Sequence, residues 1–230
     1  MGRTILRLIL AVLLLAGLPA AARADMKATY LQPRRFETVI VEVADNGDSR
    51  LQFSGQRVWL QVVGGQGYAV YTLLQGVRVV RLADLRQLFA ERWPAVPDTS
   101  ILAGLRLVQR GTASFAGHRG IAYFAQRPND AEPVPIPMLV VSEDPALAPL
   151  GRPIAGQMDF AILSYRLAGA TIPPIFVAVR EALGSGTPLS FFGMELQYVD
   201  RSPIDPARFR LPAPPVTMEE LRAGGVPRIG

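Results

Sequence analysis

The sequence predicts a mainly β fold with helices, of the α+β class, in which a curved antiparallel sheet or incomplete β-barrel is covered by two or three helices. In residues 50–82, four short apolar runs are separated by glycine-containing breaks at 54–55, 64–67 and 75–76, a pattern typical of an antiparallel meander. Several runs are apolar on both faces; in one, Val58 and Leu60 alternate with Trp59 and Val63. Such a sheet needs other parts of the chain packed on both of its faces.

The first 24 residues are typical of a secretory signal peptide. Arg3 and Arg7 precede an apolar run over residues 8–18, and small residues flank Arg23 before Asp25. An uncleaved membrane anchor would need about 20 apolar residues. We therefore expect cleavage after residue 24, export to a periplasm and no transmembrane segment in the mature protein.

Cleavage would remove most of the positive charge. The full chain has 24 basic and 19 acidic residues, a net charge of +5, but Arg3, Arg7 and Arg23 lie in the signal, which leaves 21 against 19, or +2. The remaining arginines are scattered, so we expect no nucleic-acid partner. The chain has no cysteine, which excludes disulfides and the thioether anchor of a lipoprotein.

Residues 25–215 are long enough for one β-rich domain with a sizeable core, and we expect residues 216–230 to form a flexible C-terminal tail. Residues 26–32 are either a short strand or an ordered lead-in. Residues 35–44 predict a strand, and Asn46-Gly47 predicts the turn that follows it, so the first sheet has about five strands by residue 82. Residues 83–93 then change to a helical period, with Leu85, Leu88, Phe89 and Trp93 on one stripe.

The second half of the chain predicts a hairpin, a buried strand, two helices and a final strand. The hairpin comprises residues 105–115 and 121–126, the buried strand residues 138–142, the helices residues 157–167 and 173–183, and the final strand residues 190–200. In the final strand, period-two alternation places Phe192, Met194, Leu196 and Tyr198 on one face.

Residues 203–215 follow the final strand and are rich in proline; we call them the exit segment. We expect Phe209 and Leu211 to pack on the domain and hold this segment in place. After it, Thr217 and Glu220 have the spacing of a capping box for a terminal helical turn.

A Gly-x-x-x-Trp segment at residues 55–59, two late helices, a final strand and an Ile-Asp-Pro-x-x-Phe-x-Leu-Pro exit at residues 204–212 follow one another in this order. The order resembles the periplasmic lipoprotein-carrier superfamily over residues 36–212. This resemblance implies an incomplete β-barrel whose apolar space against the helices holds acyl chains. Residues 25–33 are too short and polar for the first helix of those carriers, and residues 213–215 lack their glycine, so the resemblance indicates a relative and not a true lipoprotein carrier.

The sequence offers no catalytic constellation. His118, the single histidine, lies in a predicted hairpin turn, and no Gly-x-Ser-x-Gly elbow accompanies Ser114 or Ser142 as a partner nucleophile. Glu143-Asp144 predicts a turn or a helix start, because neighbouring strand residues point in opposite directions. The glycines of residues 64–67 precede a strand and no helix, unlike a phosphate-binding loop. We expect no enzyme, no metal and no cofactor.

The sequence favours a non-enzymatic periplasmic binding or carrier protein for a lipid or other amphiphile held between sheet and helices. The alternative is an envelope structural or protein-interaction module with a filled core and no ligand. Both a lipid and an envelope protein remain candidate partners. The candidates for an apolar pocket are Phe53, Trp59, Tyr71, Phe192, Met194, Leu196 and Tyr198. The candidates for a lid are Met158, Ile162, Tyr165, Phe176 and Val179.

Overall fold

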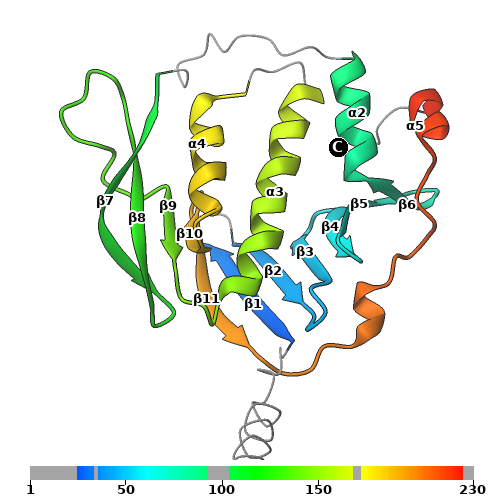
Figure 1. The fold of residues 1–230 in the computed structure, drawn as a ribbon, viewed down its shortest axis with the longest axis horizontal. Coiled ribbons are helices and arrows are strands. Elements are labelled where there is room, and N and C mark those ends of the chain that lie inside the picture. The colour runs from blue at the N-terminus through cyan, green and yellow to red at the C-terminus, as the bar shows by residue number, and fades with distance from the viewer. Residues whose placement is uncertain (1–24, 34–35, 93–103, 168–171, 225–230) are drawn as a thin grey trace, which may run out of the picture.

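In a computed structural model that describes residues 25–33, 36–92, 104–167 and 172–224, the described residues form one eleven-stranded antiparallel sheet. Its strand order is β6-β5-β4-β3-β2-β1-β11-β10-β9-β8-β7, and β6 and β7 do not pair with each other, so the sheet is open. Figure 1 shows the three longest helices next to one another on one side of this sheet. The predicted class, mainly β with helices and an antiparallel sheet, is confirmed, and the sheet is not a closed barrel.

The strands fall into two groups along the chain. The first group is β1 (Met26–Gln32), β2 (Glu37–Val43), β3 (Ser49–Phe53), β4 (Val58–Val63), β5 (Gln66–Leu73) and β6 (Gly76–Arg81). The second group is β7 (Arg106–Phe115), β8 (His118–Gln126), β9 (Leu139–Ser142), β10 (Thr187–Phe191) and β11 (Met194–Asp200). The meander predicted in the first half is therefore present, with β1 as its additional first strand.

Strand β1 joins the two groups. It pairs with β2 on one side and with β11 on the other, so that Lys27 lies opposite both Glu42 and Asp200. The side chain of Tyr30 is fully buried, and its hydroxyl donates a hydrogen bond of 2.8 Å to the carbonyl of Pro188. Of the two alternatives for residues 26–32, the strand is correct.

Three helices follow or interrupt the strands: α2 (Leu82–Arg92), α3 (Ala148–Leu167) and α4 (Pro174–Leu183). In α2 the predicted stripe is buried, although residue 93 lies outside the described residues. The sequence predicts the start of this helix at residue 157, but helix α3 begins at Ala148. Gly151 and Pro153 are unfavourable inside a helix, so the local pattern does not indicate these first turns. A Cβ at Gly151 would lie 2.8 Å from the carbonyl oxygen of Gly186, so close packing explains the glycine.

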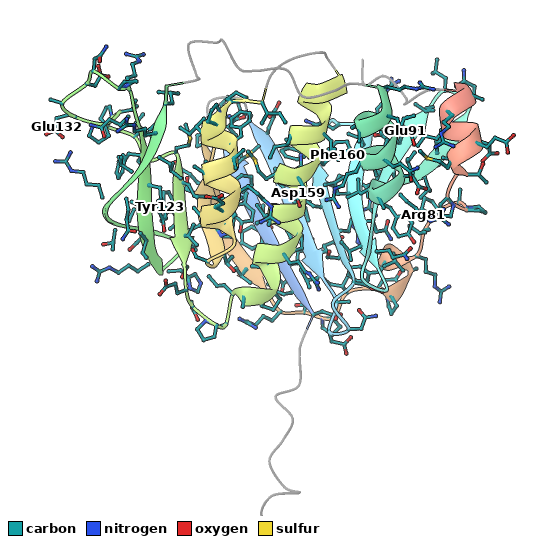
Figure 2. All side chains as sticks on the ribbon, turned by 45° about the horizontal axis from the view of Figure 1, so that its top comes forward. Arg81, Glu91, Tyr123, Glu132, Asp159 and Phe160 are labelled. Carbon is teal, nitrogen blue, oxygen red and sulfur yellow. The ribbon has the colours of Figure 1, made fainter. Side chains whose placement is uncertain are left out.

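The three helices are linked through Asp159. Its carboxylate lies 2.7 Å from Nε of Arg180 on α4 and 3.6 Å from a guanidinium nitrogen of Arg86 on α2. Figure 2 shows Asp159 on the middle helix, between the other two. A single carboxylate thus connects α3 to both neighbouring helices.

Both faces of the sheet bury apolar side chains, as the two-faced strands predicted. On one face, Leu150, Ile154 and Val179 of the helices pack with Val41, Leu51 and Leu189 of the sheet. On the same face, α2 and Phe160 of α3 pack with Leu60, Ala69 and Val80. On the other face, Leu211 and Ala213 of the exit segment pack with Tyr68, Val70 and Val79.

The C-terminal segment wraps around the β6 edge of the sheet. Helix η1 (Pro206–Phe209) lies beside β3 and β4, and the N–H of Val216 then donates to the carbonyl of Val79 over 2.9 Å. Helix α5 (Met218–Gly224) follows, with the predicted capping box between Thr217 and Glu220, and fully buries Leu221 in the cluster around α2.

The flexible tail expected over residues 216–230 is corrected for residues 216–224, while residues 225–230 lie outside the described residues. Residues 218–224 are helical, and Arg222 of α5 forms an ion pair of 2.8 Å with Glu91 of α2. Figure 2 shows Glu91 on the side of α2 that faces α5.

The strand predicted over residues 190–200 is in fact the hairpin of β10 and β11. Moreover, Thr29 lies opposite Tyr198 while Tyr30 lies opposite Leu196, so Gln197 is an extra residue in a β-bulge. Because the bulge reverses the alternation, Leu196 is 2% exposed whereas Tyr198 is 54% exposed on the opposite face. The prediction that both side chains share a face is wrong for this reason.

An ion pair between the partly exposed Arg208 and the buried Glu42 connects the exit segment to the sheet and generates a prediction. Glu42 of β2 is 3% exposed, and its carboxylate accepts hydrogen bonds from the guanidinium of Arg208 at 2.7 to 2.9 Å. Replacing Arg208 by alanine should lower the free energy of unfolding by about 2 kcal/mol, since the carboxylate stays buried without its partner. Urea unfolding measures this change.

Two variants make this test specific. Arg208→Ala combined with Glu42→Gln should recover part of the loss, because the buried carboxylate is then a neutral amide; the recovery is only partial, since Arg50 opposite it on β3 loses a neighbouring negative charge. Arg110→Ala removes an exposed partner of Glu132 and should change stability by less than about 0.5 kcal/mol. Equal effects of Arg208→Ala and Arg110→Ala would contradict a structural role of the buried pair.

Candidate functional site

An apolar cleft of about 430 Å³ lies between helices α3 and α4 and one end of the sheet; we call it the helix–sheet cleft. Nine of its thirteen lining residues are apolar, and the other four are three glutamines and a glutamate. They are Gln32, Glu37, Phe53, Gln56, Ile154, Gln157, Met158, Ala161, Phe176, Leu183, Phe191, Phe192 and Met194. Its volume is within the usual range of small-molecule sites, about 300–1,000 Å³.

The walls of the cleft come from segments distant in sequence. Ile154, Met158 and Ala161 follow the i, i+4, i+7 spacing of one helical face on α3. Phe53 is the last residue of β3 and Met194 the first of β11, so the cleft opens at the end of the sheet where these strands meet their turns. Neither group of strands would form it alone.

Phe192 has the most unusual backbone in the cleft. It has φ of 49° and precedes Gly193 with φ of 81°, so both residues of this two-residue hairpin turn are left-handed. Such turns favour asparagine or glycine at both positions, and a left-handed phenylalanine costs about 1–2 kcal/mol. The turn is held by the Phe192 N–H, which donates to the carbonyl of Met138 over 2.9 Å.

The ring of Phe192 contacts helix α4. It meets Phe176 edge to face, with ring centroids 5.5 Å apart and an interplanar angle of 81°. The same side chain is 37% exposed and also lines a second cavity of about 440 Å³ beside the loop at residues 127–138. Phe192 is therefore a shared wall between two apolar cavities.

The structure brings five of the predicted residues into the helix–sheet cleft. They are Phe53, Phe192 and Met194 from the pocket set, and Met158 and Phe176 from the lid set. Leu196 and Val179 are buried in the core under the helices, with Ile162 packed against that core, and none of the three lines the cleft. Tyr165 lies near the end of α3.

The remaining predicted pocket residues are elsewhere. Tyr71 is buried in the cluster under α2, where loss of hydration raises the pKa of its hydroxyl far above the usual value. Trp59 lies on the opposite face of the sheet, where its ring is 4.7 Å from the guanidinium carbon of Arg50 and its Nε1–H donates to Gln61. Tyr198 is exposed on that face as well, through the bulge in β11.

Sequence reasoning missed most of the polar residues of the cleft and its turns. Gln32, Glu37 and Gln56 lie at strand ends or in a turn, and only the pairing of distant strands brings them together. Phe191, the last residue of β10, also lines the cleft, because residues 190–194 are the end of a strand and a turn and not the continuous strand that their alternation predicts. No local signal in the sequence identifies these positions.

A further cavity of about 510 Å³ lies at the opposite end of the sheet, beside the start of α3. It is lined mainly by turn residues and by small side chains, with Arg152 and Arg201 among them. The guanidinium of Arg201 donates to the carbonyl of Ala146 over 2.8 Å and so contributes to the structure of this turn. We take the helix–sheet cleft as the candidate site because aromatic and aliphatic side chains from both helices and the sheet enclose it.

The polar residues considered for catalysis form a local turn network. His118 is the first residue of β8, not a turn residue as predicted, and its Nδ1 lies 3.2 Å from a carboxylate oxygen of Asp144. The hydroxyl of Ser142 accepts a hydrogen bond of 3.3 Å from the N–H of Asp144. The histidine is thus oriented by a carboxylate, while this serine contacts the backbone of that same residue.

Within the part of the chain that the structure describes, no three His, Cys, Asp or Glu side chains cluster in a way that could hold a metal ion. None of the described helices is both long and apolar enough to cross a membrane. No family model, no curated protein and no solved structure matches the chain.

The left-handed Phe192 gives a prediction that separates stability from binding. Phe192→Asn should leave the free energy of unfolding within about 1 kcal/mol of the original, because relief of backbone strain offsets the lost ring contact. The same variant should weaken binding of an apolar fluorophore in the helix–sheet cleft, since it removes one wall. Thermal unfolding and fluorophore titration measure the two effects.

Met138→Leu, which alters the second cavity and keeps the turn, serves as the control. A Phe192→Asn protein that binds the fluorophore as well as the original would show that the cleft is not the binding site.

Proposed function

We propose that this protein is a non-enzymatic carrier or binding protein that holds the apolar part of a lipid or other amphiphile in the helix–sheet cleft. The observation that carries the proposal is the composition of this cleft, in which an apolar interior between α3, α4 and the sheet meets a border of three amide side chains and the carboxyl group of Glu37. In this proposal, α3 and α4 cover the sheet and act as the lid. In this proposal, the open sheet is a relative of the incomplete barrel of the periplasmic lipoprotein-carrier superfamily, which the order of the elements along the chain resembles.

The energetics of the cleft are adequate for one acyl chain. Burial of a methylene group contributes about 0.8 kcal/mol, so a chain of about ten buried methylenes contributes about 8 kcal/mol. Association itself costs at least about 4 kcal/mol. The remaining free energy corresponds to weak and reversible binding, which suits a carrier that must release its ligand.

The polar border indicates how an amphiphile would be oriented. Gln56 is exposed, while Gln32 and Gln157 are half-buried, and their amides can exchange hydrogen bonds with a head group or with water. The apolar side chains of Ile154 and Met158 are buried deeper on α3. An amphiphile would therefore place its chain against α3 and its head group at the turns.

The proposal includes export of the protein by a cleaved signal. Asp25, the first residue after the expected cleavage point, already belongs to the folded part of the chain. Its carboxylate accepts hydrogen bonds from the N–H of Asp45 at 3.1 Å and of Ile204 at 2.7 Å. Cleavage before Asp25 would leave these contacts intact, which supports a mature protein that begins there.

A charge placed in the helix–sheet cleft tests the proposal. Ala161→Asp puts a carboxylate on the cleft face of α3 and should weaken binding of a dansyl-labelled fatty acid by about tenfold or more, because a charge must then be desolvated. Fluorescence titration of the mature protein measures the dissociation constant. Native mass spectrometry of the protein purified from periplasm would show the class of any ligand that it already carries.

Ala178→Asp is the matched control, because it makes the same change at a half-buried position of α4 that does not line the cleft. We expect this variant to bind like the original. A folded Ala161→Asp protein with undiminished uptake, or a mature protein that takes up no amphiphile at all, would contradict the proposed function.

One observation favours a protein-interaction module as the second candidate. Strand β7 is the edge of the sheet, pairs only with β8 among the described strands, and leaves one side of its backbone open to strand addition. In that case, the protein should form a defined complex in periplasmic extract that native gels resolve, and Gln109→Lys with Ser114→Lys on this edge should abolish it. An unchanged complex would exclude β7 as the docking edge.

A further inference from the structure

Two apolar cavities meet at the turn between β10 and β11. The first is the helix–sheet cleft of about 430 Å³, and the second is the cavity of about 440 Å³ beside the loop at residues 127–138. Among the described lining residues, Phe192 is the one that lines both. Its ring therefore separates two spaces of nearly equal volume.

The strand order places the two cavities in line along the sheet. The cleft is bordered by Phe53, the last residue of β3, and by Phe191 and Phe192 at the end of β10. Strands β2, β1 and β11 lie between β3 and β10, whereas β9 and β8 follow β10 on its other side. Ala125 of β8 and Met138, next to β9, line the second cavity. The second cavity thus continues the cleft in the same direction, with Phe192 between them.

The second cavity has a mainly apolar lining. Leu105, Ala125 and Met138 contribute to its walls, together with apolar residues of the loop. Among its described lining residues, Arg127 is the only one with a charged side chain, and that guanidinium lies 3.9 Å from the carboxylate of Asp130. The space beyond Phe192 therefore suits the end of an apolar chain better than a polar head group.

The ring of Phe192 is held from two sides. The N–H of Phe192 donates to the carbonyl of Met138 over 2.9 Å, which attaches the turn to the strand beyond it. On the helix side, the ring meets Phe176 of α4 edge to face, with centroids 5.5 Å apart. Helix α4 itself lies between α3 and the β7–β8 hairpin (Figure 1). The ring is thus held at the end of the cleft that faces the second cavity.

Phenylalanine is an unfavourable residue for this turn. Phe192 has φ of 49°, in the left-handed region that asparagine and glycine adopt with less strain. It is also 37% exposed, so complete burial does not explain the aromatic side chain. Residues that persist in such a conformation are typical of functional sites, including those that hold a ligand. The position of the ring between two apolar cavities indicates what that function is.

We infer that Phe192 sets the length of the apolar chain that the helix–sheet cleft accepts. The head group lies at the β3 end of the cleft, beside Gln56, and the chain extends across the sheet until its end meets the ring of Phe192. Methylenes beyond that length stay in water and add little to the affinity. Because this role rests on the proposed function, its test must let the two fail separately.

A series of saturated fatty acids from octanoic to eicosanoic acid tests this role. Displacement of a dansyl-labelled fatty acid from the mature protein measures the affinity for each. In the original protein, affinity should rise about fourfold per methylene until the chain fills the cleft, and should then stay constant. Phe192→Gly removes the ring and fits the left-handed backbone. In this variant the constant region should begin about two methylenes later, so that the longest acids gain about tenfold relative to the acid that fills the original cleft.

Three further variants make the test specific. Phe192→Asn also suits this backbone and should move the constant region in the same direction, which guards against a folding defect of the glycine variant. Ile136 lines only the second cavity and is 59% exposed, so Ile136→Asp should fold normally. Added to Phe192→Gly, it should restore the original chain length, because the chain end would then meet a charge. Phe53→Ala removes a ring at the other end of the cleft and should lower all affinities without moving the constant region.

The outcomes separate the role of Phe192 from the proposed function. A mature protein that binds none of the fatty acids contradicts both. If the original protein binds them but Phe192→Gly and Phe192→Asn keep the same chain-length limit, the role of Phe192 is overturned and the carrier function stands. The role is also overturned if Phe53→Ala moves the limit equally, or if Ile136→Asp leaves the longer limit of Phe192→Gly unchanged.

Discussion

The pairing of β1 with β11 is the interaction on which the rest of this structure depends. It joins strands that are more than 160 residues apart, as in the register of Lys27 opposite Asp200, and makes one sheet of two groups of strands. The helix–sheet cleft takes Gln32, Glu37 and Phe53 from the first group and Phe191 and Met194 from the second. Without this pairing, the cleft would lose one of its two sides, and Tyr30 would lose its buried contact with Pro188.

Two-sided burial is the second constraint, and it explains why the chain continues beyond its last strand. A sheet with apolar residues on both faces exposes one of them unless another element packs there. Helices α2, α3 and α4 pack on one face, and the exit segment packs on the other through Leu211 and Ala213. Because α5 then returns Leu221 to the helix side, the β6 edge is also protected from pairing with another sheet.

The proposed binding of an amphiphile depends on the shape of the helix–sheet cleft, which is concave and mainly apolar and so can exclude water from a chain. Phe192 has two roles in this arrangement, since it is a wall of the cleft and a turn residue with a left-handed backbone. Its ring contact with Phe176 connects the β10–β11 turn to helix α4. The geometry of the cleft therefore depends on a turn whose backbone is strained.

The sequence by itself determined the meander, its two-faced strands, the three main helices and the capping box at Thr217, because alternation, helical period and glycine breaks are local properties. Tertiary structure alone decided the partner of β1, the true start of α3 and the bulge that turned Tyr198 to the opposite face. The candidate site divides in the same way. Apolar residues such as Phe53 and Met158 could be predicted from their pattern, but Gln32 and Gln56 entered the cleft only through strand pairing across the whole chain. Periodicity gives the face on which a residue lies, whereas the neighbours of that face depend on contacts that no local pattern encodes.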